Sequence, residues 1–200
     1  MWSAFKIVMQ KLMHQMIDGM YMDEEDYQLL RRRLAFTGRL VPLYSGEEAF
    51  MRLAKREEYG DIFRLEQLAY DGKSPWHKEM FYKDLNRNPR TIYIIMEYNG
   101  EKIAFLGART TDGYDLHISN ICVLPQYRCL GCASALIVQL VQFAEILAKK
   151  EITLEVRQSN SKAIRLYQRM GFIKTGIKPE YYQPEKEDAI EMTFELQRAL

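Results

Sequence analysis

Hydrophobic residues along this chain repeat at the spacing of helices in some segments and at the spacing of strands in others. From residue 5 to residue 20 apolar side chains recur every three or four positions, which predicts an amphipathic helix with a methionine-rich face. The same periodicity predicts helices at residues 57–70, 78–86 and 134–149. Residues 152–157 instead alternate between apolar and polar, as expected of a strand with one buried face.

Two dipeptides in the middle of the chain suit tight turns. Asn99-Gly100 and Asp112-Gly113 both favour the type I′ turn of a two-residue hairpin, and apolar segments flank each of them. We therefore expect an antiparallel meander of three strands, at residues 92–98, 103–110 and 114–124.

The C-terminal third predicts one more helix and two more strands. Ser159 or Asn160 suits the N-cap of the helix, and Gly171 suits a left-handed stop at its end. Strands at 172–178 and 189–196 would complete a mixed, mostly antiparallel sheet flanked by helices, an α/β (α+β) fold. A first core strand is expected near Leu53.

Composition and charge narrow the function classes. The chain has 200 residues, 48% of them apolar, which suits one domain with an appendage. We expect residues 1–48 to be a helical extension and residues 49–200 the functional domain. The net charge of +1 predicts no nucleic-acid partner, and without a run of eighteen apolar residues we expect no membrane span. The N-terminus does not resemble a signal peptide, and the three cysteines fall within eleven residues, so we expect a cytoplasmic protein.

The most informative motif is a short loop of small residues between the third meander strand and the helix that follows. It reads Arg128, Cys129, Leu130, Gly131, Cys132, Ala133 and Ser134. Unpaired N–H groups at a helix start, together with the helix dipole, bind phosphate. The order Arg-x-x-Gly-x-Ala is neither the P-loop nor the dinucleotide fingerprint, and an ordinary strand-to-helix turn is the alternative reading.

A second motif, about thirty residues later, strengthens the phosphate interpretation. It runs from Leu154-Glu155-Val156-Arg157 through Ser159-Asn160 and Leu166-Tyr167 to Gly171-Phe172. Together the two motifs resemble the GNAT superfamily of N-acetyltransferases, and within it the RimI subfamily, over about residues 52–196. The resemblance implies acetyl-CoA as co-substrate, no metal, and direct transfer to a primary amine. The implied acceptor is the N-terminal alanine of a ribosomal protein.

The resemblance also implies roles for single residues. The pyrophosphate of the coenzyme would lie on the loop, and its pantetheine arm would pair with the backbone of Ile121, Cys122 and Val123. Asn160 would add a further coenzyme contact, although an N-cap role is the alternative. Glu155 is the implied general base and Tyr167 the implied general acid. Their alternatives are an ion-paired strand glutamate and a packed core tyrosine.

The sequence leaves open the acceptor and the role of the N-terminal helix. Trp76, Tyr181 and Tyr182 are candidates for the acceptor groove, with simple packing as the alternative. Other acceptors are a lysine side chain or a small amine, and a non-catalytic acyl-CoA sensor is the alternative outside enzymes. The N-terminal helix could mediate self-association.

Cysteine and histidine chemistry adds only lesser hypotheses. Oxidation of the pair Cys129 and Cys132 would distort the loop, and an acetylated Cys122 intermediate is a weaker alternative to direct transfer. The three histidines, at positions 14, 77 and 117, show no ligand spacing.

Overall fold

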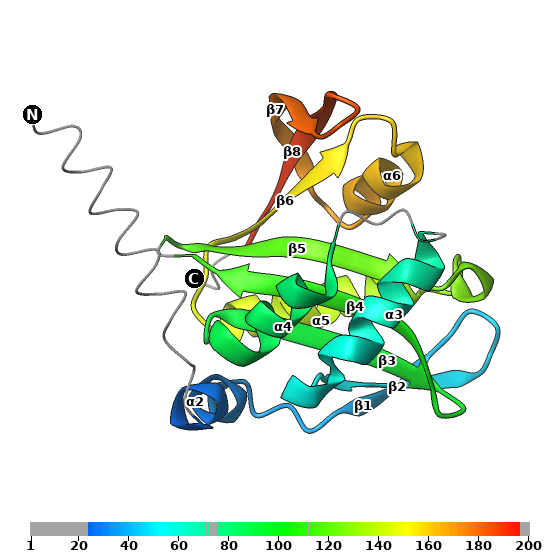
Figure 1. Cartoon of the computed structure of the whole chain (residues 1–200), viewed down its shortest axis with the longest axis vertical. Helices are drawn as coiled ribbons and strands as arrows, with labels where there is room; N and C mark the ends of the chain where they lie inside the picture. The colour runs from blue at the N-terminus through cyan, green and yellow to red at the C-terminus, as the bar shows by residue number, and fades with distance from the viewer. Residues whose placement is uncertain (1–23, 71, 73–75, 112, 197–200) are drawn as a thin grey trace, which may run out of the picture.

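The chain folds around one eight-stranded sheet, seen in a computed structural model that describes residues 24–70, 72, 76–111 and 113–196. The strand order is β1-β2-β3-β4-β5-β6-β8-β7 (Figure 1). The strands are β1 (Arg39–Pro42), β2 (Glu48–Leu53), β3 (Thr91–Tyr98), β4 (Glu101–Thr110), β5 (Asp115–Val123), β6 (Glu151–Arg157), β7 (Ile173–Tyr182) and β8 (Glu187–Glu195). The helices are α2 (Glu24–Leu34), α3 (Tyr59–Ala69), α4 (Lys78–Arg87), α5 (Cys132–Ile146) and α6 (Ser161–Arg169), with 3-10 turns η1 (Arg56–Glu58) and η2 (Pro125–Tyr127).

The meander expected from the sequence is present, and one of its two predicted turns is confirmed. Asn99 and Gly100 have φ values of 49° and 79°, as a type I′ turn requires. The second predicted turn includes Asp112, which lies outside the described residues, so it stays a prediction. In the described part of that connection, the hydroxyl of Thr111 accepts the N–H of Gly113 at 3.1 Å and donates to Asp115.

The sheet divides between β5 and β6. These strands pair in parallel only from Asp115↔Glu151 to Ile118↔Leu154, whereas β5 continues to Val123 and β6 continues to Arg157 beside β8. The backbone of the last part of β5 therefore faces a widening gap on its β6 side, as the resemblance implied.

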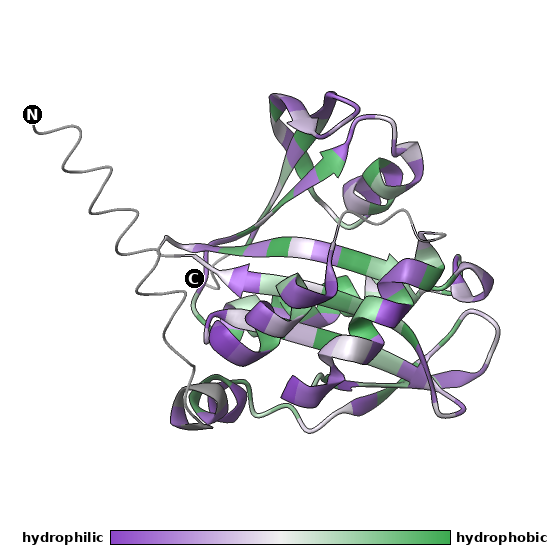
Figure 2. Ribbon diagram, viewed as in Figure 1, coloured by the Kyte–Doolittle hydropathy of each residue, from purple (hydrophilic) through white to green (hydrophobic). Residues whose placement is uncertain are grey.

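Helices α3 and α4 cover one face of the larger part of the sheet and α5 covers the other (Figure 1), and Figure 2 shows hydrophobic colour along the central strands. One core lies under α5 and contains its buried residues Leu136, Ile137 and Leu140. The other lies under α3 and α4 and includes Phe81 and Cys122. The divided end of β5 thus lies between two packed layers that hold it in place.

The N-terminal extension is partly described. Residues 24–34 are helical, as expected, but residues 39–42 form strand β1, which pairs with β2 at the edge of the sheet and was not predicted. Leu34 and Leu43 are buried in the core under α5. The predicted methionine-rich helix at residues 5–20 lies outside the described residues, so the division of the chain at residue 48 stays a prediction.

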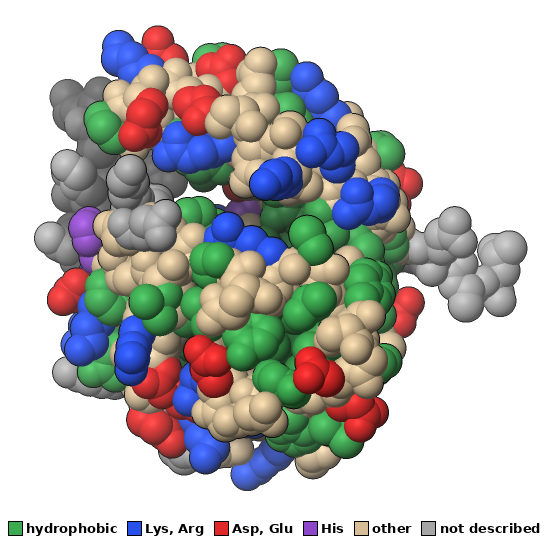
Figure 3. Space-filling view, turned by 90° about the vertical axis from the view of Figure 1, so that its right-hand side faces the viewer, with side chains coloured by type: hydrophobic (Ala, Val, Ile, Leu, Met, Phe, Trp, Pro, Cys, Tyr) green, Lys and Arg blue, Asp and Glu red, His purple; other side chains and the backbone are tan. Residues whose placement is uncertain are grey.

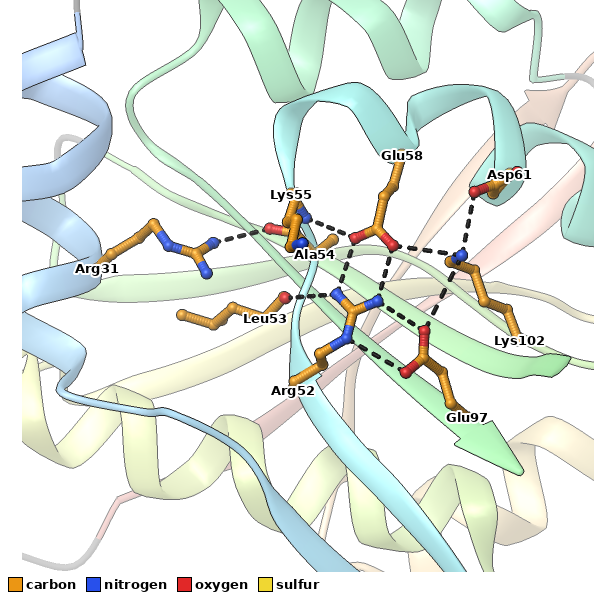
Figure 4. Close-up of polar contacts among 9 residues, drawn as sticks. All are labelled: Arg31, Arg52, Leu53, Ala54, Lys55, Glu58, Asp61, Glu97 and Lys102. Atoms are coloured by element: carbon orange, nitrogen blue, oxygen red, sulfur yellow. Dashed lines mark hydrogen bonds and ion pairs between the residues drawn. The ribbon is translucent and has the colours of Figure 1, made fainter. Parts of the chain in front are cut away.

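An ion-pair network joins β2, β3 and β4 to the start of α3 (Figure 4). The guanidinium of Arg52 bonds both oxygens of Glu58, at 2.8 and 2.7 Å, and also contacts Glu97 at 2.6 Å. Lys102 adds contacts to Glu58 and Asp61, at 3.3 and 3.0 Å. Burial alone would raise the pKa of Glu58, but its bonds with Arg52 and the backbone prevail and lower it to about 2. The network fixes where α3 begins.

Candidate active site

The loop of residues 128–134, the predicted phosphate loop, has the backbone that its sequence predicts. Gly131 has a φ of 89°, a value that glycine adopts without strain, and Cys129 has a φ of 62°. Helix α5 begins at Cys132, two residues before the predicted start. The N–H groups of its first turn, from Cys132 to Ser134, have no partners within a helix and lie at the positive end of its dipole.

The side chains of the loop are mostly used for internal contacts. Arg128 donates from Nε to the carbonyl of Val123, at 3.1 Å, and from Nη2 to that of Ala69, at 2.7 Å. Cys132 is buried and its thiol donates to the carbonyl of Tyr127 at 3.6 Å. Burial raises the pKa of that thiol, whereas Cys129 is exposed, so only Cys129 is accessible to an oxidant. A phosphate bound here would therefore depend on backbone donors.

The last residues of β5 border the gap in the sheet. Ile121 and Val123 are partly buried, while Cys122 is buried between the sheet and α3, with its thiol directed to the carbonyl of Leu65. Burial raises the pKa of the Cys122 thiol. Because the thiolate is the nucleophilic form, this environment argues against an acetyl-cysteine intermediate.

Glu155 lies on β6 directly after the last residue that pairs with β5, and both of its carboxylate oxygens are engaged. Oε2 lies 3.1 Å from Nε2 of His117, and Oε1 accepts from Nζ of Lys178 at 2.5 Å. The hydrogen bond with His117, followed by that with Lys178, lowers the pKa of Glu155 to about 2. The side chain is only 13% exposed. Glu155 is therefore a largely buried carboxylate anion that binds the ammonium of Lys178 and the ring of His117.

The sequence analysis missed His117 and Lys178, the two partners of Glu155. On its other side, Nδ1 of His117 lies 2.9 Å from the hydroxyl of Thr153, which in turn lies 3.2 Å from Oδ2 of Asp115. The parallel pairing of His117 with Thr153 creates this row. The row leads from Glu155 along β5 and β6.

Tyr167 projects from α6 into the core under α5, where its ring packs 5.7 Å from that of Phe172. Burial, and secondarily the neighbouring Tyr70 and Tyr182, raise the pKa of its hydroxyl. The phenol therefore keeps its proton at neutral pH and can act as a donor. Tyr70, at the end of α3, is a further neighbour that the sequence analysis missed.

The aromatic candidates for the acceptor groove lie on different elements, Trp76 just before α4 and the two tyrosines at the end of β7. Trp76 packs against Phe81 with ring centroids 5.4 Å apart, so it is at least partly a core residue. Tyr181 and Tyr182 meet edge to face at 5.1 Å, and the guanidinium of Arg157 lies 4.3 Å over the ring of Tyr182. Burial raises the pKa of Tyr182 to about 12, and Tyr181 is half exposed.

Asn160 caps α6, as predicted, because its side-chain oxygen accepts the N–H of Ala163 at 3.1 Å. Its amide nitrogen can still donate to a ligand. Lys162, Arg165 and Arg169 are exposed on the same helix. A space-filling view of this end of the molecule shows a hollow below the lobe that contains β6–β8 and α6, with Lys and Arg side chains gathered along its rim (Figure 3).

No helix in the described part of the chain is long and apolar enough to span a membrane. The described residues also include no group of three His, Cys, Asp or Glu residues placed to hold a metal ion.

The chain is similar to known acetyltransferases. The model of the acetyltransferase (GNAT) family matches residues 56–172. A Bacillus subtilis protein named as a [ribosomal protein bS18]-alanine N-acetyltransferase is 30% identical over 72% of this chain and 94% of its own. The Escherichia coli enzyme of that name is 32% identical over 65% of this chain and 86% of its own. The crystal structure of the ribosomal-protein-S18-alanine N-acetyltransferase from Escherichia coli superposes with a TM-score of 0.68, covering 76% of this chain and 96% of that one, at 27% identity.

Proposed function

The chain belongs to the GNAT family of acetyltransferases, and from that membership we propose that it acetylates the N-terminal alanine of a ribosomal protein. The acetyl group would come from acetyl-CoA, the co-substrate of the family. The observation that carries the proposal is Glu155, an anion held at the division of the sheet and a neighbour of Tyr182, which in turn neighbours Tyr167. The named acceptor of the relatives supports the choice of bS18.

Binding of the donor follows from the backbone. The pyrophosphate would accept N–H donors at the start of α5, and the pantetheine arm would pair with Ile121–Val123 in the gap beside β5. This arrangement brings the thioester to the point where β5 and β6 part, next to Glu155. Arg128 contributes by holding the start of the loop to α3.

The acceptor amine must lose a proton before it attacks. An N-terminal ammonium has an ordinary pKa of about 8, so Glu155, with a pKa of about 2, is some 6 pH units too acidic to keep that proton. We infer that Glu155 positions the ammonium where Lys178 now lies, and that the proton passes to solvent water, because a terminal ammonium releases its proton readily near neutral pH. His117, whose ring faces both Glu155 and Thr153, holds the carboxylate in place.

The neutral amine then attacks the thioester carbonyl, and a tetrahedral intermediate forms. As the carbon–sulfur bond breaks, the sulfur takes the bonding electrons and the hydroxyl proton of Tyr167. The amine nitrogen loses its second proton, which replaces the one that Tyr167 gave to the sulfur, and the products are the acetylated peptide and free CoA. Transfer is direct, because the Cys122 thiol is buried with a raised pKa.

A lysine side chain is the second candidate acceptor, and a specific contact favours it. Lys178 already places an alkyl ammonium 2.5 Å from Glu155, so the carboxylate accepts that group without rearrangement. A peptide with an acetylated N-terminus and a free lysine separates the two acceptors.

The test is release of CoA thiol in the presence of a peptide that copies the N-terminus of bS18. We expect peptide-dependent release that falls by about 100-fold or more in Tyr167→Phe, the usual range for loss of an acid–base group. Release should also fall in Glu155→Gln, which lacks the charge that positions the ammonium. Glu151→Gln, at the start of the same strand, is the matched control and should retain activity. If the chain binds acetyl-CoA but releases no thiol with this peptide, the ribosomal acceptor is wrong.

A further inference from the structure

The turn between β1 and β2 touches the phosphate loop. The N–H of Tyr44 donates to the carbonyl of Leu130 at 3.1 Å. The ring of Tyr44 lies against Gly131, because a Cβ atom built on that glycine would come within 3.2 Å of Tyr44 Cε1. An aromatic side chain from the N-terminal extension therefore lies directly on the predicted pyrophosphate site, at the same end of the molecule as the start of α5 (Figure 1).

Several contacts hold this turn in place. The side chain of Leu43 is buried in the core, and the N–H of Gly46 donates to the Leu43 carbonyl at 2.9 Å. Glu47 accepts the hydroxyl of Tyr98 at 2.7 Å, and the Tyr98 ring packs edge to face on Tyr127, just before the loop. The backbone of the turn is thus fixed relative to the loop.

The ring of Tyr44, in contrast, is directed outward and is 78% exposed. An exposed tyrosine on a fixed backbone loses little conformational entropy when a flat ligand covers it. The hairpin also precedes residue 56, where the match to the family begins, so it is an addition to the matched domain.

The order of the strands indicates which part of the coenzyme would lie near the β1–β2 turn. The pantetheine arm would occupy the gap between β5 and β6, whereas β1 and β2 lie on the opposite side of β5. Because the pyrophosphate joins pantetheine to adenosine, the adenosine leaves the loop at the end opposite to the arm. Tyr44 lies over Gly131 on the β1–β2 side of that loop.

We propose that Tyr44 stacks on the adenine of coenzyme A and is a binding residue for the donor. The inference rests on acetyl-CoA being the donor of the proposed function. Purine rings stack on aromatic side chains regardless of base identity, and each such contact strengthens binding measurably. The hairpin thereby gives the N-terminal extension a direct role in donor affinity.

Titration calorimetry of the full chain with CoA and with 4′-phosphopantetheine, which lacks adenosine, tests the proposal. We expect Tyr44→Ala to weaken CoA binding about tenfold, within the range for loss of one base–aromatic stack, and to leave 4′-phosphopantetheine binding unchanged. Tyr44→Phe keeps the ring and should bind CoA like the natural chain. Tyr114→Ala removes a tyrosine of similar exposure, 65%, at the opposite end of β5 and is the matched control.

The outcomes separate this inference from the proposed function. Unchanged CoA binding in Tyr44→Ala, or equal weakening for both ligands, would overturn the stacking role, the second result indicating a distorted loop. Absence of CoA binding in the natural chain would instead refute acetyl-CoA as the donor.

Discussion

The ionisation of Glu155 gives a prediction that can be worked out from the contacts around it. His117 and Lys178 lower the pKa of Glu155 from an ordinary 4.5 to about 2. At 1.36 kcal/mol per pH unit, this difference corresponds to roughly 3 kcal/mol of stabilisation of the folded state. The carboxylate is only 13% exposed, so solvent screening reduces that figure little.

The sign follows from the depressed pKa. The stabilisation is present in full above the pKa of the unfolded chain and is lost as the pH falls towards the pKa of the folded chain. About 1.5 kcal/mol should already be lost at pH 3.5. Glu155→Gln cannot ionise, so its free energy of unfolding should lack this component.

The assay is urea unfolding of the natural chain and Glu155→Gln at several values between pH 3.5 and pH 7. The gap in unfolding free energy between the two proteins should narrow by about 1.5 kcal/mol from pH 7 to pH 3.5. Other depressed carboxylates, such as Glu58, are common to both proteins and cancel. A gap that stays constant over this range would refute the coupling of Glu155 to His117 and Lys178.

Three further predictions concern the loop, the ion-pair network and a buried amide. Gly131→Ala should weaken CoA binding at least tenfold in calorimetry, because φ of 89° strains alanine and its methyl group meets the Tyr44 ring; unchanged affinity would contradict this. Glu58→Gln should lower the unfolding free energy by about 3 kcal/mol in urea titration, since Arg52 and Lys102 lose a shared, largely buried partner; Glu57→Gln is the neighbouring control. Asn120→Leu should raise the melting temperature in calorimetry, because both polar atoms of this amide are buried without a partner among the described residues; a lower melting temperature would count against it.

Much of the fold could be predicted because local signals were strong. The asparagine–glycine turn at residues 99–100, the cap at Asn160 and the stop at Gly171 each depend on a few adjacent residues, and all three are confirmed. The glycine-containing loop before α5 was recognisable for the same reason. The short edge strand β1 was missed, because four residues are too few to show a periodicity.

The partners of Glu155 could not be predicted, because long-range pairing brings them together. His117 meets Glu155 because β5 pairs in parallel with β6. In this pairing His117 lies opposite Thr153, 36 residues later in the chain. Lys178 reaches Glu155 across the C-terminal hairpin, where β7 extends to Tyr182 and its register shifts between Lys178 and Tyr182. A periodic pattern shows which face a residue occupies but not which distant side chain shares it. The roles assigned to Glu155 and Tyr167 stay predictions, because a periodic pattern does not show which side chains surround them.

The measurement that tests the central claim most directly is the location of the acetyl group after reaction. The acceptor would be a peptide that copies the N-terminus of bS18 and carries one internal lysine, and fragment mass spectrometry would identify the modified nitrogen. We expect acetylation of the alanine α-nitrogen by the natural chain and little by Glu155→Gln. Acetylation of the lysine alone, or none with acetyl-CoA bound, would contradict the proposed N-terminal activity.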